Sequence, residues 1–137
     1  MQITANHMHF FISYAVAFLV FGLIGKWYVW PSIKDRPLKP ALTPLLLYAC
    51  LRVNGLMFLM PGLVSPDLPS AFAVPMLWLF NIVGLLDLIY ANISTFRDHV
   101  DPTQLGSSYF LAVLNVPAMV VVHVIIFAYL LRRRATK

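Results

Sequence analysis

Several polar side chains interrupt long apolar stretches of the sequence, and their residue types could carry chemistry. They are Arg52, Asn54, Asn81, Asp87, Asn115 and His123. A carboxylate or an imidazole can accept and return a proton, and a guanidinium can hold an anionic group. In a soluble core such groups are satisfied locally, whereas a charge at the centre of a bilayer costs about 2.5–3.5 kcal/mol and needs a partner or a function. The meaning of these residues therefore depends on the medium around them.

The composition indicates that this medium is a lipid bilayer. Of the 137 residues, 61% are hydrophobic and 11% are charged, and the mean hydropathy is +0.81. An ordinary soluble domain is about a quarter charged, and one of this length leaves roughly a third of its chain area in water. A soluble fold could not hide so much apolar surface. We therefore predict a multi-pass protein of the cell membrane, with residues 1–137 forming a single transmembrane domain.

Four apolar stretches are long enough to cross the hydrocarbon core as helices, which takes about 20 residues. They cover approximately residues 9–30, 41–60, 74–93 and 108–131, with polar or Pro-rich loops between them. We therefore predict an all-α polytopic membrane protein with four transmembrane helices in an up-down bundle. Both termini then lie on one side of the membrane. The basic residues divide four against five between the two sides, so the positive-inside rule assigns no orientation.

The net charge of +5 does not indicate nucleic-acid binding. The basic residues form short clusters beside the apolar stretches, where cations meet lipid phosphates, and no basic face carries interleaved aromatic residues. Cys50 is the only cysteine, which excludes an internal disulfide and a multi-thiolate metal site. His7 and His9 point to different helical faces, and His123 has no second imidazole at its depth to clamp a haem. We expect no metal and no cofactor.

The depths of the two charged residues predict an ion pair between Arg52 and Asp87. At about 1.5 Å per residue, Arg52 lies near the middle of its apolar stretch, and Asp87 lies roughly 4–5 Å from the middle of its own. Helices that follow each other in the chain are expected to be antiparallel neighbours, and an arginine side chain can bridge this offset. Asn115 reaches nearly the same depth from the last helix and could cap the pair.

A second polar level is predicted on the other side of the bilayer midplane. Its members are Asn54, Asn81 and His123. Asn81, Gly84 and Asp87 fall on one face of their helix, and Gly84 permits close approach of a neighbouring helix. Because Asn54 and Arg52 point to opposite sides of their helix, one of them must lie at a helix flank or at a contact between subunits.

The third and fourth apolar stretches carry a pattern that resembles a group of small, uncharacterised four-helix bacterial membrane proteins. In FNIVGLLDLIYA the matching residues are Phe80, Asn81, Gly84, Asp87, Leu88 and Ala91. In LNVPAMVVVHVIIFAYLL they are Val116, Pro117, His123 and Phe127. The segment GLMFLMPGLVSPDLPSAFAVP is similar to the second loop of that group. Leu86 stands where the group has a smaller residue before the Asp. The resemblance implies a four-helix membrane fold and carries no established activity.

Three functions remain open on this basis. The first is a non-enzymatic accessory or structural membrane component, as a homo-oligomer or in a larger complex, whose polar levels enforce packing. The second is binding or acid/base conversion of a hydrophobic, lipid-like or isoprenoid-like molecule in an intramembrane pocket. Asp87 or His123 would then move the proton, Arg52 would hold an anionic group, and all six polar residues would line the site. The third is a proton-coupled carrier using Asp87. A pocket that contains both Asp87 and His123 would favour the second function, and a tightly filled bundle would count against it.

Overall fold

The computed structural model describes residues 5–50, 70–97 and 101–135, and every element in these ranges is helical. The elements are α1 (Ala5–Ile24), a π-helical segment (Gly25–Val29), α2 (Trp30–Ile33), α3 (Leu38–Cys50), α5 (Ser70–Arg97), a 3-10 turn (Pro102–Leu105), α6 (Ser108–Phe110), a second π-helical segment (Leu111–Asn115) and α7 (Val116–Ala135). The prediction of an all-α protein is confirmed for the described part of the chain.

Within the described residues, three helical stretches are long and apolar enough to cross a membrane. They are Ala5–Ile33, Phe72–Thr95 and Ser108–Arg134. They coincide with the first, third and fourth predicted spans. Within the second predicted span, 41–60, α3 supplies a shorter apolar helix, Pro40–Ala49. Residues 51–60 of that span lie outside the described residues.

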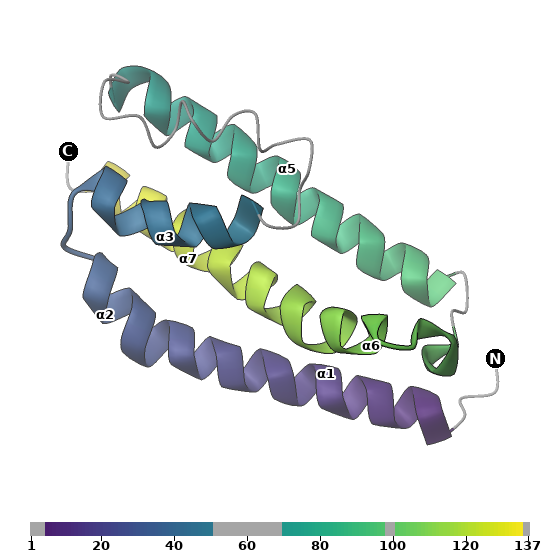
Figure 1. Cartoon of the computed structure of the whole chain (residues 1–137). Coiled ribbons are helices and arrows are strands. Elements are labelled where there is room, and N and C mark those ends of the chain that lie inside the picture. The colour runs from purple at the N-terminus through teal and green to yellow at the C-terminus, as the bar shows by residue number, and fades with distance from the viewer. Residues whose placement is uncertain (1–4, 51–69, 98–100, 136–137) are drawn as a thin grey trace.

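The helices do not alternate in direction (Figure 1). The rings of Phe10 and Tyr109 pack edge to face near the beginnings of α1 and α6, with centroids 5.8 Å apart. Further along, Gly25 lies against Val121 and Ile125 of α7. The first and last helices therefore run in the same direction, and both α3 and α5 run against them. The predicted up-down order is wrong for the described helices, and Ala5 and Ala135 lie at opposite ends of the bundle rather than on one side.

The described part of α3 is packed inside the bundle. Within its apolar part, Pro40–Ala49, the side chains of Ala41, Leu42 and Ala49 are at most 1% exposed. Counting apolar residues along the sequence does not distinguish a helix that is surrounded by protein from one that faces lipid, and it does not give the direction of the helix.

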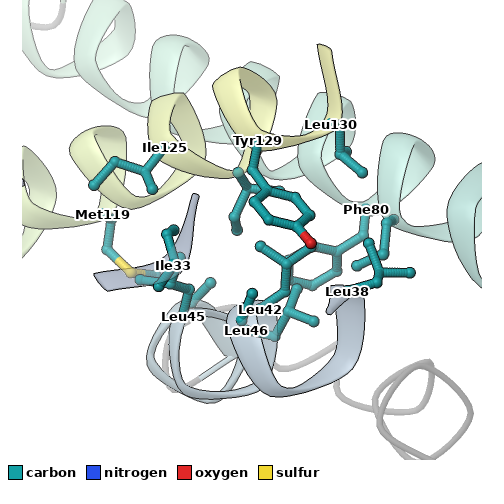
Figure 2. Packing of buried hydrophobic residues seen from close by; sticks show 14 of the residues in the cluster. Ile33, Leu38, Leu42, Leu45, Leu46, Phe80, Met119, Ile125, Tyr129 and Leu130 are labelled. Atoms are coloured by element: carbon teal, nitrogen blue, oxygen red, sulfur yellow. The ribbon is translucent and has the colours of Figure 1, made fainter. Parts of the chain in front are cut away.

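α7 occupies the centre of the arrangement, with α1 on one side, α5 on the other and α3 across it (Figure 1). Side chains from α3, α5 and α7 form the apolar core that Figure 2 shows, and its labelled members include Leu42, Leu46, Phe80, Met119, Ile125, Tyr129 and Leu130. The Tyr129 hydroxyl donates a hydrogen bond to the backbone carbonyl oxygen of Arg36 at 2.7 Å. This bond fixes the turn between α2 and α3 against the C-terminal part of α7.

Pro117 shapes the beginning of α7, and Asp101 caps the 3-10 turn that precedes α6. Pro117 has no backbone N–H, and its ring crowds the carbonyl of the preceding turn. The π-helical segment Leu111–Asn115 ends two residues before it, and such a wider turn accommodates the irregularity. Upstream, the Asp101 carboxylate accepts hydrogen bonds from the Thr103 N–H and hydroxyl at 2.9 and 2.8 Å. These bonds lower the pKa of Asp101 below its ordinary value.

Candidate functional site

Asn81 and His123 form a closed polar contact between α5 and α7. Both are 0% exposed. The Asn81 side-chain N–H donates to the backbone carbonyl oxygen of His123 at 2.9 Å, and His123 Nδ1 lies 2.6 Å from Asn81 Oδ1. Because the amide oxygen can only accept, the hydrogen bond assigns the proton to Nδ1. The prediction that these two residues share one level of the bundle is confirmed.

Gly84 allows the histidine ring to lie directly against α5. A Cβ atom at this position would lie 2.5 Å from His123 Cε1 and 2.8 Å from Nε2, closer than real side-chain contacts allow. The Phe80 ring packs on the same imidazole, with centroids 6.0 Å apart. His123 Nε2 is buried, and no described residue forms a hydrogen bond with it. The imidazole is thus enclosed by Asn81, Gly84 and Phe80.

Asp87 is placed differently from its predicted companions. The structure buries Asn81 and Gly84 but leaves the Asp87 side chain exposed. It lies two turns after Phe80, the residue through which α5 contacts the α3 side of the core (Figure 2). Among the described basic residues none lies within 4.0 Å of its carboxylate. Arg52, two residues past the last residue of α3, lies outside the described residues, so the Arg52–Asp87 pair stays a prediction.

Asn115 has a partner that sequence reasoning missed. The Tyr48 hydroxyl of α3 donates to Asn115 Oδ1 at 3.0 Å. The predicted contact of Asn115 with the Arg52–Asp87 pair stays a prediction, because Arg52 lies outside the described residues. Similarly, the Tyr14 hydroxyl of α1 donates to Asn92 Oδ1 at 2.5 Å. A tyrosine inside an apolar stretch is the available signal, because a buried hydroxyl needs a hydrogen-bond partner. Asn54, the third predicted member of the Asn81 level, lies outside the described residues.

The corrected helix directions gather the basic residues at one end of the bundle. The turn after α2, the start of α3 and the last turn of α7 carry Lys34, Arg36, Lys39, Arg132, Arg133 and Arg134. Of the described basic residues, Arg97 alone lies at the opposite end, and Lys26 lies one to two turns inward of the basic end. Arg132 forms an ion pair with Asp35 at 2.9 Å, and the Arg134 guanidinium stacks 4.8 Å from the Trp78 ring centroid.

Among the cavities that described residues line, two lie along α7, one at the basic end and one between α1 and α7. At the basic end, a cavity of about 410 Å³ is lined by Lys34, Asp35, Arg36, Pro37, Tyr129, Arg132 and Arg133. Below it, an apolar groove of about 380 Å³ runs between α1 and α7, with Gly22, Val124 and Ala128 among its walls and Lys26 and Trp30 at its end nearest the basic residues. Four of the six predicted site residues lie in the described part of the chain, and neither cavity is lined by any of these four, Asn81, Asp87, Asn115 and His123.

In the part of the chain that the structure describes, these observations define a helical protein with three helices of membrane-spanning length, a buried Asn–His contact and one strongly basic end. The chain belongs to the family described as Domain of unknown function (DUF8737), which matches residues 9–77 and 73–131. Membership in an uncharacterised family agrees with the resemblance noted in the sequence. No curated protein and no solved structure matches the chain.

Proposed function

We propose that this chain is a multi-pass protein of the cell membrane that acts as a non-enzymatic structural or accessory component, alone, as a homo-oligomer or within a larger complex. The three apolar stretches of membrane-spanning length support its place in the bilayer. The observation that carries the non-enzymatic part is the closed contact between Asn81 and His123. The Asn81 amide pairs with His123 Nδ1 and with the His123 carbonyl oxygen between two helices.

The geometry of this contact favours packing over catalysis. A general acid or base must come within hydrogen-bond reach of its substrate, and His123 is 0% exposed and presses against Gly84. In a membrane, interhelical hydrogen bonds beside small residues stabilise helix association by about 0.6–2 kcal/mol each. Asn81, Gly84 and His123 fit that role because they fix the register of α5 against α7.

A double-mutant cycle tests this role of the Asn81–His123 contact. We expect Asn81→Leu and His123→Leu each to lower the free energy of unfolding by about 1–3 kcal/mol, because each leaves a buried polar group without its partner. The double substitution should cost less than the sum, with a coupling of about 0.6–2 kcal/mol. Unfolding in mixed micelles measures the free energies of unfolding of the parent, the two single variants and the double variant.

Thr95→Val is the matched control, because the Thr95 hydroxyl bonds only to Ala91 of its own helix and should show no coupling to His123→Leu. A stabilising effect of His123→Leu alone would contradict the proposal. Replacing a residue that is retained for chemistry at the expense of stability gives a more stable protein.

We also propose an orientation for the protein in the membrane, with the basic end in the cytoplasm. Its support is the positive-inside rule, since six of the described basic residues lie at one end and Arg97 lies at the other. In a Cys50→Ser background, we expect Gln104→Cys to react with a membrane-impermeant maleimide in intact cells and Ser32→Cys to react only after lysis. Both positions are exposed, and neither substitution changes the charge. Equal labelling of both would indicate dual insertion and contradict the expected orientation.

A second candidate function is binding of a hydrophobic small molecule. The apolar groove of about 380 Å³ between α1 and α7 favours it. This groove differs from the predicted pocket, because its walls include neither Asp87 nor His123. Binding there requires no proton transfer by either residue.

A further inference from the structure

The apolar groove and the basic cavity follow one another along α7 and along the stretch that leads from α1 to the turn after α2. Trp30 lines the groove, and Lys34, one turn later, lines the basic cavity. The backbone N–H of Lys34 donates to the Trp30 carbonyl at 3.0 Å, which fixes this spacing. On the other wall, Ala128 lines the groove and Arg132, again one turn later, lines the cavity. One turn of helix is about 5.4 Å.

The two parts differ sharply in chemistry. Lys34, Arg36, Arg132 and Arg133 contribute four cations to the cavity, and Asp35 contributes one carboxylate, which leaves a net charge of +3. The Asp35 carboxylate is held by Arg132 at 2.9 Å. The groove below is walled by aliphatic and aromatic side chains, by Lys26 at the end nearest the basic cavity, and by Gly22, where an added Cβ atom would meet nothing within 4 Å. A ligand that fills both must be anionic at one end and hydrocarbon at the other.

We propose that the basic cavity and the apolar groove together bind one anionic glycerophospholipid, with its phosphate in the basic cavity and an acyl chain in the groove. The inference rests on the proposed membrane location. Basic pockets between transmembrane helices on the cytoplasmic side bind anionic headgroups, and guanidinium groups suit phosphate oxygens because they donate paired hydrogen bonds. The hydrogen bond from Tyr129 to the Arg36 carbonyl, at 2.7 Å, holds one wall of the cavity against the other before the lipid binds.

Native mass spectrometry of the full chain, released from micelles doped with phosphatidylglycerol or phosphatidylcholine, tests the proposal. We expect at least a fivefold preference for phosphatidylglycerol, because each basic residue near an anionic surface raises the affinity about fivefold. For the same reason, Lys34→Gln/Arg133→Gln should weaken its retention about tenfold or more. This variant leaves the Arg132–Asp35 ion pair in place. Arg97→Gln, at the opposite end, is the matched control and should change nothing.

A second variant tests the acyl chain separately from the phosphate. Gly22→Leu projects into the open groove and leaves the four cations of the basic cavity in place, and it should weaken phosphatidylglycerol retention several-fold. Equal retention of the two lipids, or a preference that survives Lys34→Gln/Arg133→Gln, would overturn the proposal. Displacement by millimolar inorganic phosphate would assign the cavity to a soluble anion and also overturn it. Extraction by alkaline carbonate, measured in parallel, would instead refute the membrane location itself.

Discussion

Gly84→Ala is expected to lower the free energy of unfolding by about 2–4 kcal/mol, although alanine is the better helix former. The gain in helix propensity is about 1 kcal/mol. Against it stands a methyl group 2.5 Å from the His123 ring, and overpacking of this kind costs about 1–3 kcal/mol. The ring cannot move away freely, because its Nδ1 is held by Asn81 Oδ1 at 2.6 Å. Displacing it breaks a buried hydrogen bond, which costs about 1–3 kcal/mol more.

Two other glycines provide the controls for this prediction. Nothing lies within 4 Å of a Cβ at Gly22, so Gly22→Ala should leave stability unchanged or raise it slightly. At Gly25 the added atom would meet the branch tips of Val121 and Ile125 at 2.9 and 3.0 Å, and these ends can rotate, so the loss should be intermediate. For the three glycine-to-alanine variants, the free energy of unfolding is measured in mixed micelles, and the fraction of monodisperse protein is measured by gel filtration. A Gly84→Ala protein as stable as Gly22→Ala would contradict the observed packing of α5 on α7.

The sequence was sufficient for the parts of this fold that depend on local periodicity and on depth. Three apolar stretches predict three helices of spanning length, because hydrocarbon thickness sets helix length directly. The level shared by Asn81 and His123 follows from a rise of about 1.5 Å per residue. Gly84 was correctly placed on the same face, because residues three apart on a helix lie close together in angle.

The direction and grouping of the helices could not be obtained in this way. A hydropathy window treats the stretch that contains α3 like the others, and it carries no information on whether a helix faces lipid or protein. The placement of Ala41, Leu42 and Ala49 inside the bundle depends on long-range packing against α7. Once α1 and α7 are parallel, basic residues that seemed evenly divided come together at one end. The basic cavity is therefore a product of topology, and no local motif predicts it.

The tyrosine contacts were missed for a related reason. Tyr48 and Tyr14 lie in apolar stretches and read as ordinary aromatic residues, yet each hydroxyl donates to an asparagine on another helix. Their partners, Asn115 and Asn92, are 67 and 78 residues away in the chain. Depth alone does not decide which of several polar groups at a similar level an asparagine will meet.

Asp87→Asn is expected to have the largest effect of any single polar substitution if Arg52 is its partner. Asp87 lies about 5 Å from the middle of the apolar stretch Phe72–Thr95, within the hydrocarbon of the proposed membrane. Its side chain is exposed on α5 and therefore accessible to a cation. Removing the carboxylate would leave the guanidinium unpaired, at a cost of about 3–5 kcal/mol. We expect poor membrane insertion and a low yield of monodisperse protein.

The double variant Arg52→Gln/Asp87→Asn separates an ion pair from a catalytic or carrier role for the acid. Because two neutral amides can hydrogen-bond to each other at little desolvation cost, it should recover most of the yield that Asp87→Asn loses. Arg97→Gln/Asp87→Asn is the matched control and should recover nothing, since Arg97 lies at the end of α5, about 15 Å further along the helix. An Asp87→Asn protein that inserts, assembles and unfolds like the parent would show that this carboxylate has no buried cationic partner. Its exposed position on α5 would then have to serve a contact with another subunit or a transported proton.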